Sequence, residues 1–128
     1  MSTIRVDNFG PSAGGTTYSA RGIAKAWVNF NGTGTIAERD SENVSSLTDN
    51  GTGDYTVNFS NAFGAGDYAM LAACSYRSGN YNAAHIFTTA AGAISAPTTT
   101  AARLQLSTVT LGSGDSEYVT AAIHGDLA

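Results

Sequence analysis

The sequence predicts an all-β domain, an antiparallel β-sandwich of six to eight strands with a jelly-roll-like arrangement. Apolar and polar residues alternate with a period of two in several short segments, and no segment shows helical periodicity. Turn signals recur about every ten residues. The 15 glycines favour tight turns, because glycine adopts positive φ without steric cost.

The expected strands lie within residues 23–128, which we assign to one sandwich domain because 128 residues leave room for a single core. The clearest element is a hairpin at Asn43–Phe59, where an Asn50-Gly51 step separates two strand-like segments. An acidic bend is expected at residues 40–42. The other expected strands are Ile23–Phe30, Thr35–Arg39, Tyr68–Tyr76, Ala84–Thr89, Arg103–Leu111 and Tyr118–His124.

Residues 1–22 differ from the rest of the chain. Met1–Val6 is expected to form a short extended arm, and a glycine-rich connector follows it. An arm that precedes a compact domain either docks on a neighbouring subunit or remains a frayed terminus. Both alternatives stay open on the sequence alone.

The composition indicates an unusual surface and limits the partners. Hydrophobic residues make up 42% and charged residues only 12%, so Ser, Thr, Asn and Gly must cover much of the surface. The net charge of −4 and the scattered basic residues argue against nucleic-acid binding. No apolar stretch approaches the length of a membrane span, so membrane insertion is not expected. The first residues carry no signal peptide.

The residues that often perform chemistry occur without the spacing that chemistry requires. His85 and His124 lack metal-ligand spacing and are expected to be structural. A glycosidase needs two carboxyls beside one bond, one of them buried, yet most aspartates here lie in Gly/Asn-type turns. We therefore expect a non-enzymatic protein with no catalytic residues, no metal and no cofactor.

One loop is a candidate binding site for a host-surface glycan or protein. It contains Tyr76, Arg77, Asn80 and Tyr81. Rigid tyrosine rings stack on sugars or peptides, and the polar side chains orient the ligand. The alternative is that these tyrosines cover the end of the sandwich or a subunit seam.

Two further residues are candidates for an oligomer interface. Ile23 and Trp27 alternate with inward-facing residues of the first expected strand and add apolar area to its outer side. A core of this size is not expected to absorb that area. Burial against symmetry mates would contribute roughly 25 cal/mol per Å².

Three sequence strings carry a resemblance to a known family. They are GIAKAWVNFNGTGT at residues 22–35, RDSENVSSLTDNGTGDYTVNF at residues 39–59 and HGDLA at residues 124–128. They resemble a domain of tail-fibre-like and other structural proteins of bacteriophages, over the first half of the domain and its last residues. The resemblance implies a virion protein that forms a homotrimer and assembles with other phage proteins. Because no signal peptide is recognised, we expect it to be made in the host cytoplasm.

Three functions follow from these observations. The leading hypothesis is a non-enzymatic virion structural protein, in a tail fibre or other appendage, that contacts the host surface. The alternative is a capsid decoration or head-fibre protein anchored by its N-terminal arm. Longer relatives carry the domain on a stalk, whereas only about 22 residues precede it here. The third alternative is a polysaccharide depolymerase, suggested by the ten carboxylates alone.

Overall fold

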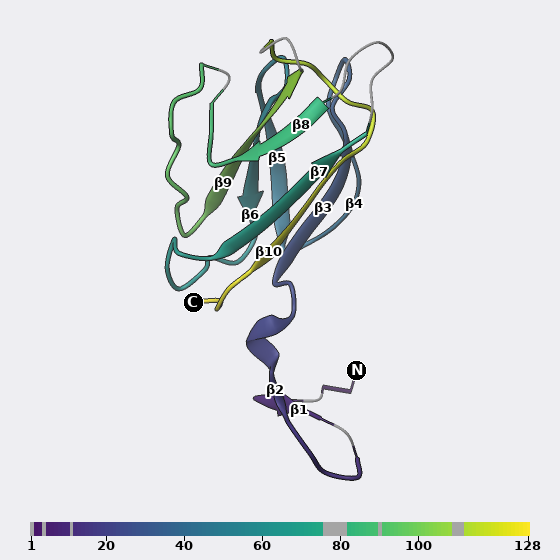
Figure 1. Ribbon diagram of the computed structural model, residues 1–128, viewed down its shortest axis with the longest axis vertical. Helices are drawn as coiled ribbons and strands as arrows, with labels where there is room; N and C mark the ends of the chain where they lie inside the picture. Colours follow the sequence, from purple (N-terminus) through teal and green to yellow (C-terminus); the bar gives the residue numbers. More distant parts are fainter. Residues whose placement is uncertain (1, 4, 11, 76–81, 90, 109–111) are drawn as a thin grey trace.

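The computed structural model describes residues 2–3, 5–10, 12–75, 82–89, 91–108 and 112–128. Within these ranges eight strands form two four-stranded antiparallel sheets that pack face to face (Figure 1). The expected all-β sandwich is therefore confirmed.

Each sheet takes strands from both halves of the sequence. The β3 sheet has the order β4-β3-β10-β7, with β3 at Ala26–Asn31, β4 at Ala37–Glu42, β7 at Ala69–Cys74 and β10 at Val119–His124. The β6 sheet has the order β5-β6-β9-β8, with β5 at Val44–Gly51, β6 at Asp54–Phe59, β8 at Asn82–Ile86 and β9 at Ala101–Thr108. The chain crosses between the sheets after β4, β6, β7 and β9.

The β5–β6 hairpin is confirmed, with a shorter loop than the sequence suggested. Gly51 pairs with Asp54, so Thr52 and Gly53 alone connect the two strands. Gly53 has a φ of 66°, and a Cβ there would lie 2.8 Å from two backbone oxygens. Glycine is therefore required at this turn for both its conformation and its size.

The expected acidic bend at residues 40–42 is wrong. Strand β4 continues to Glu42, and the chain turns at Asn43, whose φ is 55°. The Asn43 side chain stabilises this turn, because its Oδ1 accepts a hydrogen bond from the Asn61 backbone N–H at 2.7 Å. Charged residues suit an edge strand such as β4, since they discourage pairing with another chain.

The core lies between the two sheets and is rich in aromatic side chains. The Phe30 ring of β3 meets the Tyr55 ring of β6 edge to face, with centroids 5.1 Å apart. A second cluster fills the opposite end of the sandwich, where Phe59, Phe63 and Tyr68 have ring centroids 4.8–5.7 Å apart. Every second residue of β3, β6 and β10 is buried, as period-two patterning requires.

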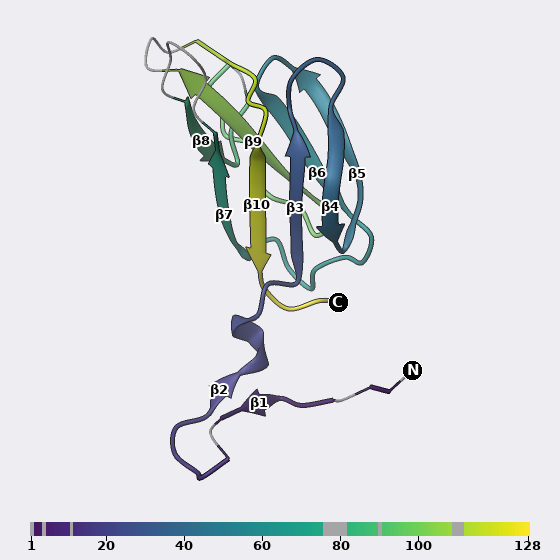
Figure 2. The same cartoon turned by 90° about the vertical axis from the view of Figure 1, so that its right-hand side faces the viewer.

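The N-terminal arm projects from one end of the sandwich (Figure 2). It contains the paired strands β1 (Asn8–Phe9) and β2 (Tyr18–Ser19), followed by the short 3-10 helix η1 (Ala20–Gly22). Two polar contacts hold its base: Lys25 Nζ donates to the Ala20 carbonyl at 3.1 Å, and His124 Nδ1 lies 3.0 Å from the Gly22 carbonyl. Among the described residues, no helix is long and apolar enough to cross a membrane.

Candidate interaction surface

The outer face of the β3 sheet carries an apolar row at its centre. Trp27 of β3 pairs laterally with Ala122 of β10, and Ala122 pairs with Leu71 of β7. Directly paired residues on neighbouring antiparallel strands point to the same side of the sheet. Trp27 alternates with the fully buried Ala26 and Val28, so this row points outward.

The small residues of β10 make this face hollow. Thr120 and Ala122 project little, whereas Trp27 rises from one neighbouring strand and Leu71 from the other. The result is a shallow groove of about 510 Å³ over β10. We call it the Trp27 trough; it is lined by side chains of Trp27, Asn29, Leu71, Ala73, Thr120 and Ala122.

In the single chain, apolar side chains of the trough are exposed to water, which does not stabilise the fold. Leu71 is 62% exposed although it sits in the middle of a strand. A single exposed leucine is ordinary on a protein surface. Here, however, it adjoins Ala73, Ala122 and a half-buried tryptophan in one continuous patch, which is typical of a surface that binds another molecule.

Charged side chains border the trough along β4. Glu42 pairs with Trp27, and Asp40 pairs with Asn29. Both acidic residues therefore lie on β4 directly beside residues of the trough. The Arg39 side chain extends from β4 toward β3 and β10: its Nη1 lies 3.5 Å from Asn29 Oδ1, and its guanidinium stands 4.1 Å from the centre of the Tyr118 ring. Its Nη1 also donates to the Glu117 carbonyl at 2.7 Å. The β4 border is thus mainly acidic beside the apolar centre.

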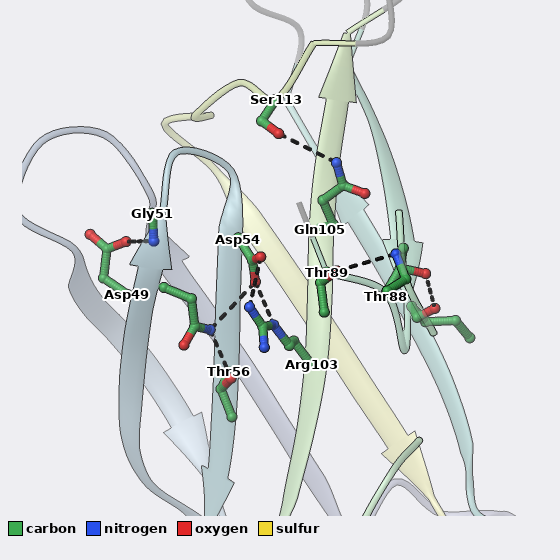
Figure 3. Close-up of polar contacts among 12 residues, drawn as sticks. Asp49, Gly51, Asp54, Thr56, Thr88, Thr89, Arg103, Gln105 and Ser113 are labelled. Atoms are coloured by element: carbon green, nitrogen blue, oxygen red, sulfur yellow. Dashed lines mark hydrogen bonds and ion pairs between the residues drawn. The ribbon is translucent and has the colours of Figure 1, made fainter. Parts of the chain in front are cut away.

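The outer face of the β6 sheet has the opposite character, and Figure 3 shows the part of it around Asp54, Thr56 and Arg103. Its side chains bond to one another across the strands: Asn58 Nδ2 donates to Thr48 Oγ1 at 3.0 Å and to Ser46 Oγ at 3.1 Å. Asn50 Nδ2 donates to Thr56 Oγ1 at 2.9 Å. These donors and acceptors are satisfied within the chain, so the face gains little from a partner.

An ion pair between a partly exposed arginine and a buried carboxylate anchors this polar face. Arg103 of β9 binds Asp54 of β6 through two parallel contacts, Nε to Oδ1 at 2.7 Å and Nη2 to Oδ2 at 2.9 Å. Asp54 is 1% exposed, and its hydrogen bond raises the pKa of the Arg103 guanidinium. No sequence pattern predicts this pair, because its members are far apart in the chain and neither lies in a motif.

This buried carboxylate bears on the depolymerase alternative. A glycosidase acid must exchange a proton with the substrate, and a second carboxyl must face it across the bond. The bidentate contact with Arg103 instead uses both oxygens of Asp54 in the ion pair. This geometry fits a structural role for Asp54 better than an acid–base role.

The residues that most often bind metals are spread over the fold. His85 Nε2 lies 2.6 Å from Ser107 Oγ, and His124 contacts the base of the arm. Cys74 of β7 is half-buried, and this burial raises the pKa of its thiol. In the part of the chain that the structure describes, no three His, Cys, Asp or Glu side chains are grouped to hold a metal ion.

The loop candidates Tyr76, Arg77, Asn80 and Tyr81 lie outside the described residues. The described residues that follow the ends of β3 and β7 are well bonded. The Tyr55 hydroxyl lies 2.7 Å from Asp115 Oδ1 and 2.8 Å from the Gly32 carbonyl. Ser75, just before the loop, donates its backbone N–H to the Tyr118 carbonyl at 2.8 Å.

The interface candidates Ile23 and Trp27 both lie in the described chain. Trp27 forms one wall of the trough, whereas Ile23 precedes β3 and is 51% exposed near the arm. The other apolar residues of the trough, Leu71, Ala73 and Ala122, were not predicted from the sequence. Alternation alone places them on one side of their strands, but only the order β3-β10-β7 brings them beside Trp27.

The chain was compared with protein-family models, curated proteins and solved structures, and no match was found in any of the three.

Proposed function

We propose that this chain is a non-enzymatic structural protein of a bacteriophage virion that works by assembling with copies of itself. The observation that carries the proposal is the Trp27 trough, an apolar hollow at the centre of one outer sheet face. The polar face opposite shows that this fold can cover a sheet with hydrogen-bonded side chains. The apolar residues of the other face are therefore best explained by a partner.

The place in the virion that we propose is a tail fibre or other appendage. The low charge content and the resemblance of residues 22–35, 39–59 and 124–128 to phage structural domains support this assignment. A homotrimer is the oligomer that the resemblance implies. Host contact through Tyr76–Tyr81 remains part of the proposal as a binding role for that loop.

A second candidate is a capsid decoration or head-fibre protein. It is favoured by the N-terminal arm, which leaves the sandwich and forms its own small hairpin (Figure 2). An arm of this kind suits attachment to a shell of other subunits. Deletion of residues 2–20 tests attachment through this arm, because a decoration protein that is anchored by it should no longer be found on capsids.

The test of the proposed function is the content of purified particles. Mass spectrometry of phage particles from the source of the sequence should detect peptides of this chain at a constant ratio to the major capsid protein. Antibody-gold labelling then places the chain on tail or head. Particles without its peptides, from lysates in which the chain is abundant, contradict the proposal.

A further inference from the structure

We infer that the Trp27 trough is the docking site for the N-terminal arm of a second copy of this chain. The inference rests on the proposed function, since it names the surface and the segment through which copies assemble. It follows from three features of the molecule: the width of the trough, the pattern of the arm and the direction in which the arm leaves the sandwich.

The trough has the width of one extended chain. Its walls, Trp27 and Leu71, stand on β3 and β7, which are separated only by β10. Two strand spacings amount to about 10 Å, enough for one extended segment but not for a helix with its side chains. The small side chains of Thr120 and Ala122 form a floor along which such a segment can lie.

The first residues of the arm have the pattern that this floor requires. Val6 is 55% exposed, and in the sequence it alternates with Ile4 and with the polar residues Arg5 and Asp7. An extended segment with this alternation turns its apolar side chains to one face. Val6 can then pack between Trp27 and Leu71 while Arg5 remains at the solvent side.

The charges at the border agree with this occupant. Glu38, Asp40 and Glu42 lie on β4 beside the trough and outnumber the one basic residue of that strand, Arg39. Residues 1–6 contain one charged side chain, the basic Arg5. A long arginine side chain reaches past the tryptophan wall toward these carboxylates, which would favour the arm over an acidic segment.

The direction of the arm points to another copy. The arm leaves the base of β3 and extends away from the sandwich rather than over the outer face of its own sheet (Figures 1 and 2). The trough of the same chain is therefore uncovered, and the arm is presented to a neighbour. Exchange of arms between identical subunits closes readily into a symmetric oligomer.

The first experiment uses Trp27, the one tryptophan in the sequence, as a reporter. In the full-length protein its emission should shift to longer wavelength on dilution, as arms dissociate and water reaches the indole. Val6→Asp should show the long-wavelength emission at every concentration and at least about 30-fold weaker self-association in sedimentation, as loss of a buried apolar anchor predicts. Ser12→Asp adds the same charge elsewhere in the arm and should behave as the parent protein.

The second experiment is a cross-link between two different chains. Cys74→Ser is combined with Val6→Cys in one chain and with Ala122→Cys in another chain of larger tagged mass. After co-expression, a short bismaleimide should join the two chains into one mixed product. Ala83→Cys, on the exposed part of β8 in the β6 sheet, is the matched control and should give none.

The outcomes separate this inference from the proposed function. Equal emission in the parent and Val6→Asp proteins, or a concentration-independent difference caused by the chain's own arm, overturns the inference. So does a mixed product that forms equally with Ala83→Cys. If Val6→Asp still sediments as the parent oligomer, arm docking fails while self-association stands. If the parent protein is monomeric at all concentrations, self-association fails as well.

Discussion

The two outer faces of the sandwich share one strand geometry and differ in almost every side chain. On the β6 sheet, Asn58, Asn50 and Arg103 bond to neighbours on adjacent strands. On the β3 sheet, the corresponding central row is Trp27, Ala122 and Leu71. A polar face whose side chains hydrogen-bond to one another needs no partner. Covering an apolar face removes it from water and lowers the free energy. This difference is the reason why we propose that assembly uses the β3 sheet.

The largest expected effect comes from breaking the polar face. Arg103→Ala leaves the buried Asp54 carboxylate without its bidentate partner, and should lower the free energy of unfolding by about 3 kcal/mol. Arg39→Ala, beside the trough, removes an exposed cation–π contact and should cost about 0.5–1 kcal/mol. Urea denaturation measures both variants. Equal losses would mean that the two faces are not stabilised differently.

A second prediction concerns the core that both faces share. Burial raises the pKa of Tyr68 to about 12, and burial with the adjacent Asp115 carboxylate also raises the pKa of Tyr55. An unfolded tyrosine loses its proton near pH 10, so above about pH 10 ionisation lowers the free energy of the unfolded state but not that of the folded state. Stability is complete below pH 10 and should fall by about 1.4 kcal/mol per pH unit for each buried tyrosine up to about pH 12.

Denaturation series at pH 9, 10 and 11 test this sign. Tyr68→Phe removes one ionisable group, so its free energy of unfolding should fall less steeply with pH. The same slope in the variant and the parent would contradict the assignment. Because the two tyrosines lie between the sheets, the decline should occur equally in proteins altered on either outer face.

The smallest expected effect comes from the trough itself. Leu71→Ser removes a side chain that is 62% exposed, so the free energy of unfolding of the isolated domain should change by no more than about 0.5 kcal/mol. Thermal unfolding at a concentration where the protein is monomeric measures this. A loss above about 2 kcal/mol would show that Leu71 belongs to the monomer's own packing, and the contrast between the faces would weaken.

Local patterns predicted the parts of the fold that depend on neighbours in sequence. Strand β6 matches the expected alternation from Asp54 to Phe59, and its hairpin with β5 followed from the glycine-rich turn. Strand β4 ends later than expected. The charged residues at 40–42 suggested a turn, but they belong to the strand. On an exposed edge strand the same residues remain extended, and only the pairing with β3 reveals it.

Of the residues that form the candidate surface, the sequence predicted only Trp27. Its partners Leu71 and Ala122 lie on strands whose order no local pattern specifies, and the Asp54–Arg103 pair depends on the same long-range register. Such contacts are set by topology. The period of a strand shows which residues share a side, but not which strand lies next to it.

The pairing of β3 with β10 also bears on how the chain folds. These strands stand at opposite ends of the sandwich sequence, yet Phe30 and Val119 are direct partners at the centre of one sheet. During synthesis Phe30 leaves the ribosome long before Val119. Strand β3 therefore lacks its partner β10 until most of the chain has been made. Contacts of such high sequence separation slow folding and prolong exposure to aggregation. Hence the final residues of the sandwich close the sheet that carries the Trp27 trough.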